Sequence, residues 1–203
     1  MTGPALSAQT GQGLAPTRVT LDNGGVVIVR QTRKTPAVSI NLAVRAGSVC
    51  DPPDAPGATH LLGRVIDRGT TTRSAAEIAE DMEGRGITLS ISVTRHLLSM
   101  VCTCLAEDFE PVLELLGDMV MAPSVPESEL STRKGEVITA IRQDEDNPAV
   151  QAVEELMALL YPNGHPYGRR SKGTPPVVEG LTRTELLALH SSGFRPSALT
   201  AVV

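Results

Sequence analysis

A chain of 203 residues with 41% hydrophobic and 20% charged residues is long enough for one domain with its own core, and this composition excludes a disordered protein. The formal net charge is −5 and the Lys and Arg residues form no basic stripe, so we expect no nucleic-acid partner. No apolar stretch is long enough to cross a bilayer, so we expect no membrane association.

The first residues, 1–16, are rich in Gly, Ala, Thr, Ser and Pro, and we predict that they form a flexible leader. They contain no Lys or Arg and no long apolar run, so a signal peptide is not expected and the cytoplasm is the predicted location. Residues 17–203 are predicted to form one domain.

Three strands are predicted at the start of this domain. Residues 18–21 and 25–30 flank the sequence Asp22-Asn23-Gly24, which is typical of a hairpin turn. Residues 37–45 alternate large apolar side chains with small or polar ones, as expected for a strand with one buried face.

The rest of the domain mixes helical patterns with further alternating runs. Strands are predicted at 87–93, 96–105 and 198–203. Helices are predicted at 58–68, 74–84, 109–120, 127–146, 149–160 and 182–193. Capping boxes, in which Ser74 or Thr182 is followed three residues later by Glu, open two of these helices. This order predicts an α+β fold with a mostly antiparallel sheet and helices on one face.

The last predicted strand, 198–203, coincides with the end of the sequence. A strand needs a neighbour for its backbone hydrogen bonds, and an open edge invites aggregation. We therefore interpret this strand as a hint that part of the sheet is missing or is supplied by another chain.

Three cysteines, Cys50, Cys102 and Cys104, are too few and odd in number for a disulfide framework. Cys102 and Cys104 are two residues apart on a predicted strand, so both side chains point to one face. No CxxC motif or nearby His completes a zinc site with them. We predict buried thiols in a reducing compartment.

Arg169, Arg170 and Lys172 form a local group of positive charges in a predicted loop rich in Pro and Gly. A short charge run of this kind is usually solvated. We therefore predict a solvated loop and not a binding site.

Two long segments carry a family resemblance. The first, LDNGGVVIVRQTRKTPAVSINLAVRAGSVCDPP, is followed by PGATH; the second runs from EDNPAVQAVEELMALLYPNGHPYGRRSKGTPP to the final strand. In their order and spacing they resemble the N-terminal half of the pitrilysin/insulinase (M16) zinc peptidases, which include the mitochondrial processing peptidases. The resemblance implies one α+β half-domain of a clamshell that closes around an unfolded peptide, with the second half absent from this sequence.

Active members of that family carry an H-x-x-E-H motif on a helix and a third ligand, a Glu, on a later helix. Two His residues four positions apart lie on one helix face and can share one zinc ion. The Glu between them acts as general base on the zinc-bound water.

The matching positions of this sequence are largely changed. His60 matches the first His, Gly63 replaces the Glu base, and Arg64 replaces the second His. Ala140 takes the place of the third ligand, and Glu136 lies one turn earlier, out of register. With one ligand of three and a permanent positive charge at Arg64, no complete metal site, no catalytic residue and no cofactor are expected.

Other roles for these residues are open. Arg64 could pair with Glu136 or Asp67 and fill the site with an ion pair, and His60 could be a cap or a partly buried polar residue. His165, in HPYG, is predicted to fix its loop. His96 and His190 have no evident partners in the sequence.

Three functions follow from the resemblance. The first is a non-catalytic homologue, a partner or chamber-forming subunit beside an active zinc peptidase of the family or beside the missing C-terminal half. The second is an active zinc endopeptidase with a rearranged site that uses His60, Glu136 and a residue from elsewhere. The third is a truncated remnant domain with another binding role or none.

Overall fold

The computed structural model describes residues 15–32 and 34–203, so most of the predicted leader lies outside the described residues. A six-stranded sheet has the order β1-β2-β6-β3-β5-β4. The strands are β1 Thr17–Thr20, β2 Val26–Val29, β3 Ala37–Val44, β4 Thr88–Val93, β5 Leu98–Leu105 and β6 Leu199–Val202. Only the β2–β6 pair is parallel, which confirms the predicted α+β fold with a mostly antiparallel sheet.

The alternation of side chains along the strands sets which face of the sheet is buried. On β3, Ile40 and Leu42 point into the core, and β5 contributes Met100 and both strand cysteines. The alternate residues of β5, among them Val101, are exposed on the other face. Cys102 and Cys104 are buried free thiols, as predicted, and burial raises the pKa of Cys102 to about 11.

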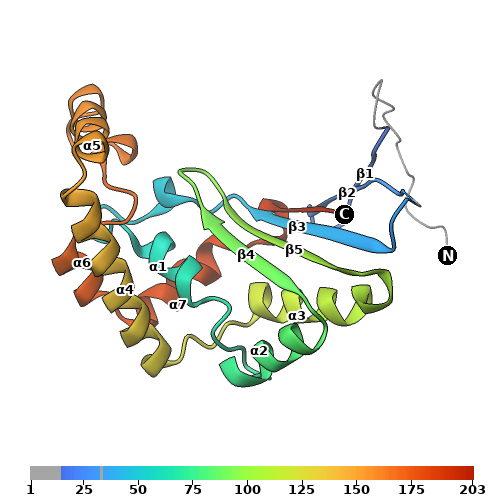
Figure 1. Ribbon diagram of the computed structural model, residues 1–203. Coiled ribbons are helices and arrows are strands. Elements are labelled where there is room, and N and C mark those ends of the chain that lie inside the picture. Colours follow the sequence, from blue (N-terminus) through green and yellow to red (C-terminus); the bar gives the residue numbers. More distant parts are fainter. Residues whose placement is uncertain (1–14, 33) are drawn as a thin grey trace.

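Helices cover one face of this sheet (Figure 1). They are α1 Ala58–Val65, α2 Ala75–Gly84, α3 Phe109–Met121, α4 Glu127–Glu145, α5 Pro148–Leu160, α6 Pro175–Gly180 and α7 Arg183–Gly193. Helices α2 and α3 lie directly under the strands, and α5 projects at one corner, away from the sheet. Among the described residues, no helix combines the length and apolarity needed to cross a membrane.

Short sequence patterns predicted the starts of two helices correctly. Ser74 and Thr182 form the predicted capping boxes, each with the Glu three residues later. Helix α6 was not predicted, because Pro-rich sequence was taken as loop; its prolines stand in the first turn, where a missing N–H costs nothing. Helix α1 ends at Val65, three residues earlier than predicted.

The interpretation of the last strand was wrong. Strand β6 inserts between β2 and β3, where Ala201 lies opposite both Val27 and Leu42. Both edges of β6 are therefore hydrogen-bonded within this chain. The sheet edges are instead β1 and β4.

Candidate functional site

Helix α1, which carries the degenerate motif, is held at its start by a buried carboxylate. Asp51, 4% exposed, accepts hydrogen bonds from the Gly57 and Thr59 backbone N–H groups, both at 2.8 Å, and from the Thr59 hydroxyl at 2.5 Å. Burial raises the pKa of this carboxyl, while the hydrogen bonds oppose that rise. Asp51 thus satisfies donors that the first turn of α1 leaves free. Sequence reasoning missed this residue, because it stands seven positions before the helix.

One face of α1 packs tightly on the edge strand β4. A Cβ atom added at Gly63 would lie 2.7 Å from the Cγ2 of Val93, closer than packed atoms come. The neighbouring side chains of Leu61 and Leu62 are fully buried. A Glu at position 63, as the family resemblance implies for active members, would therefore require the Val93 side chain to move.

The adjoining side of α1 turns to α4, and here Arg64, which the family resemblance places at the second His position, forms an ion pair. Arg64 Nη2 lies 3.0 Å from Glu136 Oε2, which is one of the two pairings predicted for Arg64. Asp67, the other candidate, pairs with Arg68 at 3.2 Å. Arg133 also contacts Glu136, so this carboxylate meets two guanidinium groups, and their hydrogen bonds lower its pKa.

His60 is the one residue that matches a metal ligand, and its ring is neutral at pH 7. Burial lowers its pKa to about 4; the charges of Lys172 and Arg64 add to that shift, and Asp144 opposes it. Asp144 is itself bound by Lys172 at 2.6 Å. The carboxylate that opposes the shift of the His60 pKa is thus already paired with a lysine.

Ala140 lies between Glu136 and Asp144 on α4, at spacings of four residues, so the three share one helix face. This face meets α1 through a shared core that includes Val65, Val137 and Ile141. The structure therefore packs α4 beside α1, so the positions that the family resemblance assigns to a metal site lie on two neighbouring helices. Within residues 15–32 and 34–203, no three His, Cys, Asp or Glu side chains are grouped so that they could hold a metal ion. The side chains at this place do not fit zinc, because a guanidinium and a methyl group stand where two ligands are needed.

The loop with Arg169, Arg170 and Lys172 is not simply solvated, so that prediction was wrong. Arg169 Nη1 donates to the Asp51 carbonyl at 2.9 Å and the Pro52 carbonyl at 3.1 Å. Arg170 pairs with carboxylates on α4 and α5, at 3.2 and 2.9 Å. Lys172 pairs with Asp144 of α4, so the three charges tie the loop to the segment before α1, to α4 and to α5.

The other histidines have structural partners. His165 accepts a hydrogen bond from the Tyr167 backbone N–H at 3.1 Å, which confirms its predicted role in the loop. His96 bonds the Tyr167 hydroxyl at 2.8 Å, and buried His190 bonds the Val120 carbonyl at 2.8 Å. The last two partners come from distant segments and could not be read from the sequence.

Comparisons with known proteins identify the family of the chain. A family model described as insulinase, peptidase family M16, matches residues 26–171. An uncharacterized zinc protease of Mycobacterium tuberculosis is 26% identical over 192 residues, 95% of this chain and 44% of the relative. The mitochondrial-processing peptidase subunit alpha of Solanum tuberosum is 28% identical over 172 residues, 85% of this chain and 34% of the relative.

The fold has solved counterparts. A peptidase M16 inactive domain from Pseudomonas fluorescens superimposes with a TM-score of 0.86 at 24% identity, over 92% of this chain and 45% of that one. A protease from Helicobacter pylori gives 0.83 at 20% identity. This chain spans less than half the length of the relatives it matches. By the family model that covers most of its residues, the chain belongs to the insulinase-type peptidases of family M16.

Proposed function

We propose that this chain is a non-catalytic member of the family, a partner or chamber-forming subunit that works beside an active zinc peptidase. The observation that carries the proposal is the Arg64–Glu136 ion pair at the second ligand position. It places a positive charge where a zinc ion would need an imidazole. Gly63, pressed against Val93, removes the general base from the same helix.

The comparisons support a shared rather than a solitary role. One relative is named as a subunit, and one structural neighbour is described as an inactive domain. The chain matches less than half of each relative's length, so a second half-domain is available as a partner in proteins of this kind. The chain's free cysteines are compatible with the cytoplasmic location that the sequence predicts.

Strand β4 is the part of the molecule that we propose contacts a substrate peptide. It pairs only with β5, so its other edge presents free backbone groups within the described part of the sheet. An extended peptide can add to such an edge as a further strand. Gly63 of α1 touches Val93 of β4, so a peptide bound there would lie beside the former metal position.

Zinc analysis is the experiment that tests this function. The purified chain is saturated with zinc, desalted and analysed for metal, with His60→Ala as the matched control. We expect near-zero zinc in both proteins and no peptide cleavage by either. One zinc per chain that disappears in His60→Ala, together with chelator-sensitive cleavage, would instead support an active peptidase with a rearranged ligand set.

A second measurement tests the partner role directly. An M16 chain with an intact H-x-x-E-H motif is assayed for peptide cleavage alone and with this chain added. We expect an increased rate or an altered choice of peptide when both are present. Identical activity and no complex at micromolar concentrations would contradict the partner role.

A further inference from the structure

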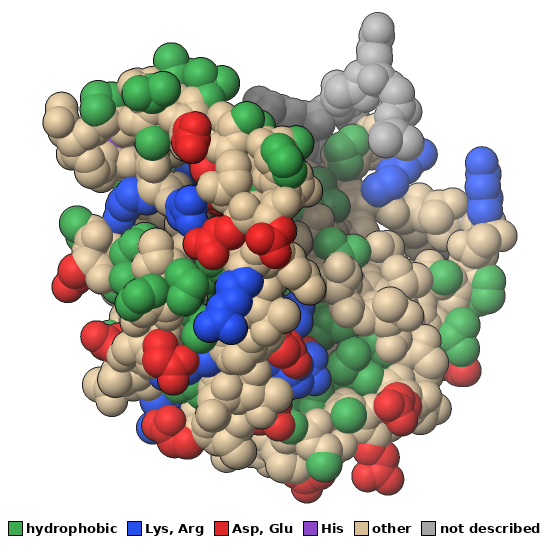
Figure 2. Space-filling view, turned by 60° about the vertical axis from the view of Figure 1, so that its left-hand side comes forward, with side chains coloured by type: hydrophobic (Ala, Val, Ile, Leu, Met, Phe, Trp, Pro, Cys, Tyr) green, Lys and Arg blue, Asp and Glu red, His purple; other side chains and the backbone are tan. Residues whose placement is uncertain are grey.

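Helix α5 is the one helix longer than two turns, among the described residues, that buries none of its side chains. It contacts mainly α4 and the short turn Pro166–Gly168. Its exposed apolar residues include Val153 at 59%, Leu156 at 53% and Leu160 at 60% exposure. Figure 2 shows hydrophobic side chains gathered at the upper edge of the molecule, where α5 projects.

These residues form a regular stripe and not a random scatter. Ala149, Val153, Leu156 and Leu160, here called the α5 stripe, follow one another at spacings of four, three and four residues. Alternating three- and four-residue spacing keeps side chains on one side of a helix and is the pattern that packs against a second helix. The stripe therefore has the form of one half of a helix–helix contact.

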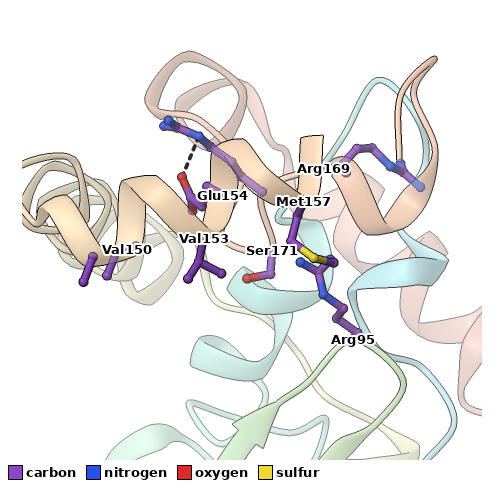
Figure 3. Close-up of a pocket in the computed structure, with 10 residues that line it drawn as sticks. Arg95, Val150, Val153, Glu154, Met157, Arg169 and Ser171 are labelled. Atoms are coloured by element: carbon purple, nitrogen blue, oxygen red, sulfur yellow. Dashed lines mark ion pairs between the residues drawn. The ribbon is translucent and has the colours of Figure 1, made fainter. Parts of the chain in front are cut away.

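A pocket of about 370 Å³ lies along one side of the α5 stripe. Val150, Val153 and Met157 line it from α5, and Arg95 and Ser171 contribute polar groups to the lining (Figure 3). Arg169 also lines the pocket, but its guanidinium turns away to the Asp51 and Pro52 carbonyls.

Arg95 is a cation without a matching anion. Its guanidinium lies 5.7 Å from the centre of the Tyr167 ring, and its buried Nη1 has no hydrogen-bond partner in residues 15–32 and 34–203. None of the ion pairs found among those residues includes it. The nearby Arg170, by contrast, is paired with Glu154 of α5. An incoming carboxylate would complete the hydrogen bonding of Arg95 in a site partly shielded from water.

We infer that the α5 stripe and the Arg95 pocket are the docking surface for an amphipathic helix of a partner subunit. That helix carries aliphatic side chains along the stripe and an acidic side chain over Arg95. The inference rests on the proposed partner role and names the surface through which the partner binds.

A second copy of this chain fits the surface less well. A helix of 13 residues is only about 20 Å long. One such contact covers less than the roughly 800 Å² per partner that stable complexes bury. The α5 stripe is therefore one part of a larger interface, and the partner subunit that we infer also touches other parts of this chain.

The test uses a fluorescein-labelled, stapled helix of about four turns, with leucine at the two apolar heptad positions and glutamate beside them. A matched peptide carries lysine in place of glutamate. Fluorescence anisotropy should show the glutamate peptide binding at least about tenfold more tightly, because only it pairs with Arg95. Arg95→Glu should reverse the preference between the two peptides.

Matched variants assign the binding to the stripe. Leu156→Asp should abolish binding, and Leu113→Asp, at an exposed apolar position on α3, should leave it unchanged; the two side chains are 53% and 41% exposed. Equal affinity for both peptides, or binding that survives Leu156→Asp, would overturn the inference. A dimer of the unliganded chain that sedimentation detects and Leu156→Asp dissolves would also overturn it, since the occupant would then be a second copy. These readouts are independent of zinc content and cleavage, so failure here leaves the test of the proposed function intact.

Discussion

Replacing Gly63 by Ala tests whether α1 truly packs against β4 without room for a side chain. Alanine favours a helix over glycine by about 1 kcal/mol, so the substitution would stabilise a helix whose surface is open. Here the new Cβ would lie 2.7 Å from Val93 Cγ2, and a valine side chain cannot turn away freely. Overpacking of this kind costs about 1–3 kcal/mol. We therefore expect a net loss of up to about 2 kcal/mol in the free energy of unfolding.

The chain contains the matched control for that experiment. Gly135 lies inside α4, and a Cβ added there meets nothing within 4 Å. Gly135→Ala should raise the free energy of unfolding by about 0.5–1 kcal/mol. Urea unfolding curves, fitted with one shared slope m, measure the change in unfolding free energy for both substitutions.

A double substitution separates the clash from other effects of Gly63→Ala. In a Val93→Ala background the obstructing methyl groups are gone, so Gly63→Ala should cost less than it does in the natural sequence or should stabilise. If Gly63→Ala stabilises the natural chain as much as Gly135→Ala does, the close contact between α1 and β4 is wrong. The argument that a side chain at position 63 requires Val93 to move would then be wrong as well.

Four further outcomes follow from the site. The pKa of His60 is lowered to about 4 in the folded state, from 6.5, so protonation of this ring does not oppose folding above pH 6.5 and opposes it increasingly as the pH falls. The free energy of unfolding should therefore be about 2 kcal/mol lower at pH 5 than at pH 7.5. His60→Gln should reduce this dependence of stability on pH. Asp51→Ala should cost on the order of 3 kcal/mol in thermal or urea unfolding, because three donors at the start of α1 lose their acceptor, and Asp51→Asn should cost less. Arg64→Ala should cost less than about 1 kcal/mol, since the side chains of Arg64 and Glu136 are 52% and 40% exposed; a loss of several kcal/mol would contradict this. The double variant with Arg64→His and Ala140→Glu should bind zinc at least about tenfold more tightly than the natural chain in a chelator competition, without gaining cleavage activity, because no base stands at position 63.

Elements with local signals were predictable from the sequence. Ser74 and Thr182 each select a helix start through contacts within four residues, and the alternation of residues 37–45 sets the buried face of β3. The insertion of β6 between β2 and β3 joins segments far apart in the chain, and no local pattern encodes that order. Prolines were taken as loop signals, and so α6 was missed, although a proline in the first turn suits a helix.

Part of the candidate site was likewise predictable from the sequence, and part depends on the fold. The substitutions at positions 63, 64 and 140 are visible in the sequence once the family resemblance is recognised. The pairing of Arg64 with Glu136 was one of two alternatives, and helix packing selects between them. The roles of Asp51 and Lys172 depend on contacts between segments that only the folded chain brings together.

The changed positions are consistent with each other, which favours a retained fold with a new role over simple decay. Two carboxylates of α4 lie near α1, and both are paired: Arg64 and Arg133 pair with Glu136, and Lys172 pairs with Asp144. Gly63 lets α1 approach β4 more closely than any larger residue would allow. A sequence that had merely lost its ligands would be expected to leave unpaired charges and loose packing at this place. The ion pairs and the close helix–strand contact instead stabilise the site without a metal, and they keep the open edge of β4 beside it.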